Sequence, residues 1–179
     1  MKPKIVFVIF SVFFLQLSSA YCLESNLYSR FSGKTVKVFV MDVKDSSPAH
    51  DLDPALVKVQ IETGLKARKS ITFQVMPTAE EADLTVETEL VSFFWTDQDP
   101  IDMIVGIGGT AMDAAVVEDY ASMQADVTVH DARSKKPLWQ KRLFATITKK
   151  PMSKSESVPL VTEIFVKTFI RDCCSKRRS

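Results

Sequence analysis

The strongest constraint on the fold is an alternation of apolar and polar side chains along three stretches, residues 84–95, 121–130 and 138–148. It holds up to Leu90 in the first stretch and at most positions of the last. Successive side chains of a β-strand point to opposite sides of a sheet, so this period of two predicts three strands with one face against a core. Beyond Leu90 the first stretch becomes mostly apolar, with Val91, Phe93, Phe94 and Trp95, which predicts either a bulge or burial of both faces. The turn-forming residues 131–137 predict that the last two strands form a hairpin.

Two other segments have the periodicity of helices. The pair Asp53–Pro54 favours a helix start, because Asp accepts hydrogen bonds from free N–H groups and Pro suits the first helical position. Apolar residues follow it at intervals of four, and a second apolar stripe begins near Ser157. Shorter strands are predicted at 35–41 and 71–75. This order predicts an α+β fold, a two-layer sandwich of mostly antiparallel sheet with two helices on one face.

The N-terminus predicts export. Lys2 and Lys4 precede the apolar run 5–15, whose 11 residues would span roughly 16 Å as a helix, about half of a bilayer core. Small residues follow at Ser18 and Ala20, which is typical of a secretory signal peptide cleaved after Ala20. An uncleaved anchor is the alternative.

We therefore divide the chain into a signal peptide (1–20), a tether (21–33), an α+β domain (34–172) and a basic C-terminal tail (173–179). We expect an exported, periplasmic protein, either free or anchored to the outer membrane. Cys22 is a candidate lipid anchor, because bacterial lipoproteins carry lipid on a cysteine at this place. Tyr21 is bulky where a small residue is usual, so both states remain open.

The remaining cysteines are Cys173 and Cys174, and an odd total leaves at least one thiol unpaired within a monomer. A bridge from Cys22 to either of them requires that the two termini meet. Structural or incidental thiols are the favoured interpretation, because a redox motif with two residues between its cysteines is absent from the sequence.

Composition argues against several function classes. A formal net charge of +1 disfavours nucleic acid as the partner, and two His with three Cys offer little for a metal site. The glycines of 106–109 lack the spacing of a nucleotide-binding loop, and the acidic segment 97–102 lacks that of a calcium loop. We predict no enzyme activity and no cofactor, nucleotide or metal. The alternative is a hydrolase that uses Asp99 and His130.

Two motifs and the order of elements resemble a known family. The motifs are Ala82-Asp83-Leu84, which opens the longest strand, and the segment 131–139 with its Leu138-Trp139 pair. Over about residues 35–172 the exported chain resembles small bacterial envelope lipoproteins of the LptE type, the lipopolysaccharide-assembly partners that plug a β-barrel, or neighbouring families of exported lipoproteins.

The resemblance implies a non-enzymatic envelope protein that binds an outer-membrane barrel protein or an anionic lipid. It implies that the exposed cations of one turn meet lipid phosphate, namely Arg133, Lys135 and Lys136, with a solvated turn as the alternative. A soluble periplasmic adaptor or an oligomeric subunit of an envelope complex is the alternative function.

The apolar, Gly-containing loop 96–117 is a candidate partner-binding loop. Its contact residues would be Met103, Ile104, Val105, Ile107 and Met112. The alternative is an ordinary loop that folds back over the core.

Overall fold

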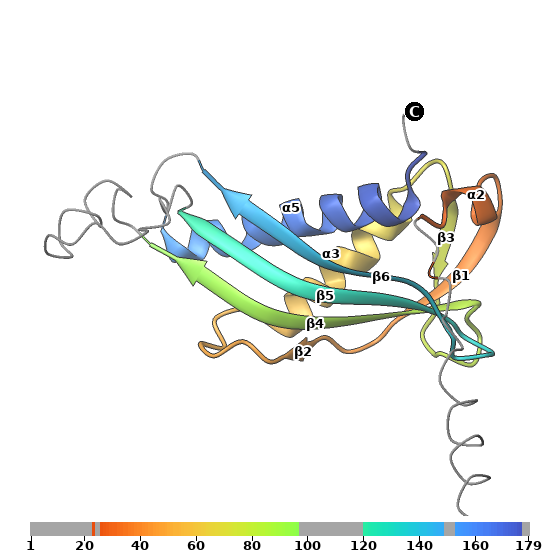
Figure 1. Cartoon of the computed structure of the whole chain (residues 1–179), viewed down its shortest axis with the longest axis horizontal. Coiled ribbons are helices and arrows are strands. Elements are labelled where there is room, and N and C mark those ends of the chain that lie inside the picture. Colours follow the sequence, from red (N-terminus) through yellow and green to blue (C-terminus); the bar gives the residue numbers. More distant parts are fainter. Residues whose placement is uncertain (1–22, 24–25, 97–119, 149–152, 177–179) are drawn as a thin grey trace, which may run out of the picture.

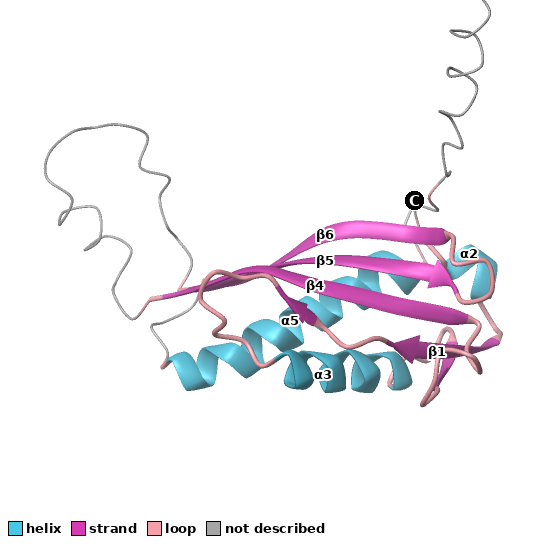
Figure 2. Ribbon diagram, turned by 90° about the horizontal axis from the view of Figure 1, so that it is seen from below, coloured by secondary structure: helices cyan, strands magenta, loops and turns pink. Residues whose placement is uncertain are grey.

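The computed structural model describes residues 23, 26–96, 120–148 and 153–176. The helices are α2 (Tyr28–Phe31), α3 (Pro54–Lys66) and α5 (Lys154–Cys174). The strands are β1 (Thr35–Val40), β2 (Lys44–Asp45), β3 (Thr72–Val75), β4 (Leu84–Trp95), β5 (Ala121–Asp131) and β6 (Pro137–Ile147). Figures 1 and 2 show one twisted sheet with α3 and α5 against the same face, which confirms the predicted two-layer α+β fold.

The sheet combines antiparallel and parallel pairing. Its order is β3-β1-β4-β5-β6, and β2 also pairs with β4. The long strands β4, β5 and β6 are antiparallel neighbours, as predicted for the hairpin. In contrast, β1 runs parallel to both β3 and β4, and β2 runs parallel to β4. Parallel neighbours need a crossover connection, and α3 supplies it between β1 and β3.

A bulge in β4 explains the change of pattern after Leu90. The pairing of β4 with β5 shifts register between Leu90 and Ser92, so that Phe93 lies opposite the buried Met123. One extra residue therefore returns the apolar side chains to the core face. Phe94 is left on the open face, where it is 38% exposed.

Helix α3 begins where the sequence predicted, whereas α5 is longer than predicted at both ends. The Asp53 carboxylate accepts a hydrogen bond from the Ala55 N–H at 2.9 Å, and Pro54 occupies the first turn as predicted. The second helix begins earlier than expected, because Ser153 and Glu156 cap its first turn reciprocally. It also continues through Cys173 and Cys174, which are almost fully buried. The predicted tail from residue 173 is therefore wrong at its start.

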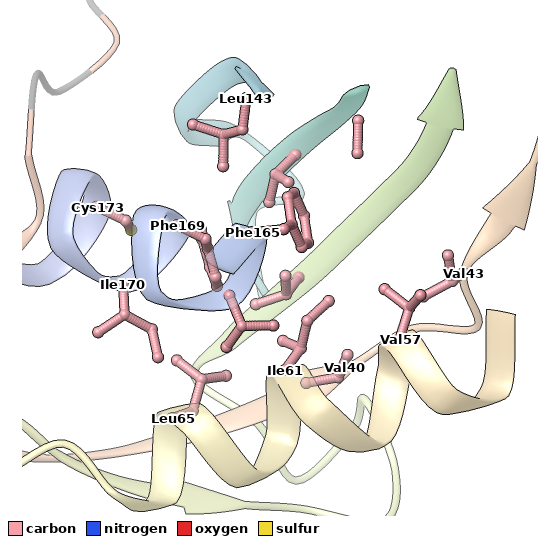
Figure 3. Close-up of a cluster of buried hydrophobic side chains, with 14 of the residues drawn as sticks. Val40, Val43, Val57, Ile61, Leu65, Leu143, Phe165, Phe169, Ile170 and Cys173 are labelled. Carbon is pink, nitrogen blue, oxygen red and sulfur yellow. The ribbon is translucent and has the colours of Figure 1, made fainter. Parts of the chain in front are cut away.

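The core lies between the sheet and the two helices. Val57, Ile61 and Leu65 face it from α3, while Phe165 and Phe169 enter it from α5 (Figure 3). The helices approach each other closely at Gly64, where an added β-carbon would lie 2.5 Å from the Cγ1 atom of Val166. Among the described residues, no helix has the length and apolar character required to cross a membrane.

The predicted tether is wrong for residues 26–33, because these residues belong to the folded domain. The Asn26 side chain donates hydrogen bonds to the backbone oxygens of Asp172 and Ser175, both at 2.9 Å. The Leu27 N–H donates to the Cys173 oxygen at 2.7 Å, and the Leu27 side chain is only 2% exposed. The last carbonyls of a helix need such donors from outside. The start of the domain is thus attached to the end of α5.

Candidate functional site

Several chain segments gather at one end of the molecule, which we call the terminal end. It comprises α2, the β5–β6 turn, and the C-terminal ends of α3 and α5 (Figure 1). Backbone hydrogen bonds connect these parts, from Leu27 to Cys173, from Gly33 to Ser70 and from Ala132 to Asp83. Residues far apart in the sequence therefore share one surface.

The β5–β6 turn holds its three cations outward. The Asp131 carboxylate accepts hydrogen bonds from the N–H groups of Ser134 at 2.8 Å and Arg133 at 3.1 Å, and from the Ser134 hydroxyl. These bonds, led by the one from the Ser134 N–H, hold the pKa of Asp131 below its usual value. The side chains of Arg133, Lys135 and Lys136 are exposed, as the sequence predicted. The carboxylate shapes the turn and leaves the cations on its surface.

Further cations converge on this turn from the N-terminal part of the domain. A cleft of about 340 Å³ separates the β5–β6 turn from α2 and the start of β1. Arg30, Lys34 and Arg133 line it together with the carboxylates of Asp83 and Asp131. Arg30 was not predicted as a site residue because it falls in the predicted tether 21–33. Lys34 was not predicted because it is the first residue after that tether and precedes the predicted strand.

The terminal end carries more basic than acidic side chains. Six exposed cations lie on α2, on β1, in the short link between α2 and β1, and in the β5–β6 turn. The acids nearby are Asp131 and the three of the neighbouring loop 76–83. The cations are Arg30, Lys34, Lys37, Arg133, Lys135 and Lys136. This surface is therefore suited to a negatively charged partner.

The other sequence-predicted site residues lie outside the described residues. They are Cys22 and the loop residues Met103, Ile104, Val105, Ile107 and Met112. Their proposed roles as a lipid anchor and as a partner-binding loop stay predictions. The acidic segment 97–102 also lies there.

The two histidines each contact one carboxylate. His50 Nδ1 lies 2.9 Å from Asp45, and His130 Nε2 lies 3.3 Å from Glu87 on the open face of the sheet. Lys44 also pairs with Glu87, and its hydrogen bond is the main reason that the pKa of Glu87 is lowered. Within the described parts of the chain, no three His, Cys, Asp or Glu side chains are grouped so that they could hold a metal ion. The predicted absence of enzyme activity stays a prediction.

Strand β6 forms one edge of the sheet. Among the described strands only β5 pairs with it. Its Phe144 lies opposite Gln124 on the open face and is 61% exposed. Lys141 points toward the helix side, where it pairs with Asp172 of α5. This edge could not be predicted from the sequence, because alternation alone does not distinguish an edge strand from a central one.

Comparisons with known proteins establish the fold. No protein-family model and no curated protein matches the chain. Among solved structures, PelC from Paraburkholderia phytofirmans, described as a dodecamer, is similar with a TM-score of 0.52 and 11% identity, over 79% of this chain and 90% of that chain. A hypothetical protein from Chlamydia trachomatis has a TM-score of 0.48 and 15% identity, over 76% of this chain and 95% of that chain. The lipoprotein GNA1162 from Neisseria meningitidis has a TM-score of 0.39 and 13% identity, over 76% of this chain and 99% of that chain.

At such identities the similarity to PelC establishes a shared α+β fold and carries no ligand or partner with it. The resemblance to the LptE type stays a prediction.

Proposed function

We propose that the protein is an exported, non-enzymatic envelope protein whose terminal end rests against an anionic membrane surface. The observation that carries the proposal is the position of the N-terminal entry to the domain. Asn26 and Leu27 bond to the C-terminal end of α5, at the same end as the cations of the β5–β6 turn. An N-terminal attachment to the membrane would therefore turn these cations toward the lipid headgroups.

The charges are adequate for reversible attraction to such a surface. Each cation near an anionic bilayer contributes about 1 kcal/mol, so Arg133, Lys135 and Lys136 together contribute about 3 kcal/mol. The attraction falls off within a Debye length of about 8 Å at physiological salt. A lipid on Cys22 would add a second signal, and stable anchoring generally takes two. Lipopolysaccharide and a barrel protein are the candidate partners that the LptE resemblance adds.

Vesicle flotation of the purified exported protein tests the proposal. We expect binding to vesicles that contain phosphatidylglycerol, weaker binding at high salt, and little binding to purely zwitterionic vesicles. A variant with Arg133, Lys135 and Lys136 all replaced by Gln should bind roughly 100-fold more weakly, which corresponds to the 3 kcal/mol above.

The matched control replaces three cations outside the terminal end by Gln. Lys44, Lys58 and Lys154 each pair with a surface carboxylate on other parts of the domain. This control changes the net charge equally and should float like the wild type. Equal losses in the two variants would show that net charge, and not the terminal end, determines binding.

A subunit of a homo-oligomeric envelope complex is the second candidate, and the edge strand β6 favours it. An exposed edge offers unpaired backbone groups to another strand, and Phe144 adds exposed apolar surface beside it. The dodecamer described for PelC, which shares the fold, adds support. Light scattering after size exclusion should show an oligomer that Phe144→Lys dissociates and Phe94→Lys, on a central strand, does not. A monomeric wild-type protein would exclude this candidate.

A further inference from the structure

The helix layer carries a groove along the contact between α3 and α5. Its volume is about 830 Å³, which is within the range of roughly 300–1,000 Å³ typical of small-molecule sites. The helices lie side by side beneath the sheet in Figure 2. The groove is not part of the cation cluster described above.

The floor of the groove is lined largely by apolar residues. Gly64 and Ala67 line it from α3, and Leu160, Val166 and Ile170 line it from α5. Because Gly64 has no side chain, the two helices come close together at that point. From Pro159 to Ser175 the groove follows α5 for about 24 Å at 1.5 Å per residue. An acyl chain spans about 15 Å, half of a bilayer core, so the groove is long enough to hold one acyl chain.

The charge of the groove is concentrated at one end. Midway along it, Lys167 forms an ion pair with Glu163 on the same helix. Arg171 pairs with Asp172. Asp172 also pairs with Lys141, so two cations share this one carboxylate. The third lining cation is Arg68, which directly follows the C-cap of α3 and reaches Ser175, the C-cap of α5.

Arg68 is held by two neutral groups. Its Nε donates to the Ser70 hydroxyl at 2.9 Å and its Nη2 donates to the Ser175 hydroxyl at 2.9 Å. A guanidinium has five N–H donors, so three remain available. The half-buried charge is thus fixed in place without a carboxylate among its described partners. An anion at this point would form charge-assisted, geometrically favourable hydrogen bonds.

We propose that the groove binds one acyl chain of an anionic lipid, with the lipid phosphate at Arg68. An apolar floor with a positive charge at one end complements an amphiphile with its negative charge at one end. Arg68 also lies at the terminal end, near Ser175, so that the charged mouth of the groove is close to the surface assigned to the membrane. The inference rests on the proposed function, because the membrane against which the terminal end lies would supply the lipid, and it specifies an anionic phospholipid.

Binding of monomeric lipid to the purified exported protein tests the inference. The probe is palmitoyl lysophosphatidylglycerol below the concentration at which it forms micelles, measured by calorimetry and native mass spectrometry. We expect one equivalent to bind at least 10-fold more tightly than the zwitterionic palmitoyl lysophosphatidylcholine. Glycerol phosphate, which has the head and lacks the chain, should bind far more weakly.

Three variants separate the two halves of the site. Arg68→Gln should weaken binding by roughly 10-fold or more, and Arg68→Lys should recover part of it. Ala67→Phe, at an exposed position, should fill the groove and abolish binding while the melting temperature changes little. Lys44→Gln, which removes a cation on the open sheet face, is the matched control and should bind like the wild type.

The inference would be overturned by equal binding of the two lysolipids with no effect of Arg68→Gln, or by normal binding of lysolipid to Ala67→Phe. Capture of an acidic amphipathic peptide without any lipid would overturn it too and indicate a peptide site. The proposed function is judged separately, because flotation depends on Arg133, Lys135 and Lys136. If the protein floats with anionic vesicles but does not bind lysolipid, the proposed membrane-facing role is supported and the proposed lipid-binding groove is rejected.

Discussion

Replacing Gly64 by alanine tests how closely α3 and α5 approach each other. The new β-carbon would lie 2.5 Å from Val166 Cγ1 and 2.7 Å from Ile170 Cδ1. Carbon atoms in favourable contact are about 3.5–4.0 Å apart, so each distance is about 1 Å too short. The Ile170 atom is the end of a flexible side chain and can turn away. Val166 is β-branched and nearly fixed in one rotamer within a helix, so the backbone has to yield there.

Two opposing terms determine the magnitude. Alanine is favoured over glycine inside a helix by about 1 kcal/mol. Overpacking of a tight contact costs about 1–3 kcal/mol. We expect a net loss on the order of 1 kcal/mol in the free energy of unfolding. For a domain of this size that lowers the melting temperature by about 2–4 °C.

The sharper test repeats Gly64→Ala in a Val166→Ala background. That background removes the Cγ1 atom and leaves the helix preference for alanine in place. Gly64→Ala should then raise the melting temperature relative to Val166→Ala alone. If Gly64→Ala stabilises the protein equally in both backgrounds, as measured by thermal unfolding, the helices are farther apart than described.

Three further changes probe other contacts. Leu27→Ala removes a buried side chain and should cost about 2–5 kcal/mol in thermal unfolding, whereas a tether would show no change. Burial works to raise the pKa of Asp172, but hydrogen bonds from Lys141 and Arg171 outweigh it and lower that pKa below 3.8. The carboxylate therefore stabilises the fold above about pH 4 and loses this effect as the pH falls further. The melting-temperature difference between wild type and Asp172→Asn should accordingly shrink in acid, and a constant difference would contradict the pairing. Asp126→Asn breaks the exposed ion pair in which Arg142 donates two hydrogen bonds to Asp126. It should lower the free energy of unfolding in urea by under about 1 kcal/mol, and a loss above about 2 kcal/mol would refute the interpretation as a surface pair.

Local signals predicted those elements that the chain determines over a few residues. Asp53 and Pro54 mark the start of α3 because capping and the fixed proline backbone act within one turn. The alternation in 121–130 identifies the core face of β5, where every predicted inward residue is buried. In both cases the responsible interactions are close in sequence, or follow directly from the period of the element.

The strand partners and the ends of the domain could not be predicted in this way. Nothing in the residues of β1 indicates that it lies parallel to both β3 and β4. Its direction relative to β3 depends on the path of α3, and its pairing with β4 depends on residues more than 40 positions away. The folding of the segment around Leu27 depends on carbonyls of α5 that are almost 150 residues away. Lys141 interrupts an apolar face, and only the position of Asp172 on α5 explains why it points inward.

The candidate site shows the same limit for charge. The cations of the β5–β6 turn were found because consecutive basic residues in a turn are visible in the sequence, whereas Arg30 and Lys34 join them only through the fold.

Arg68 is the clearest case. In the sequence it is one of several cations near a helix C-terminus, where the helix dipole accounts for them. In the structure it bridges Ser70 and Ser175 across two elements, half-buried, at the charged end of an apolar groove. A partly desolvated charge with only neutral partners is costly, and an anion that binds there recovers part of that cost. The fold thus places this charge beside the C-terminal ends of α3 and α5, with two hydroxyls and no carboxylate among its described hydrogen-bond partners.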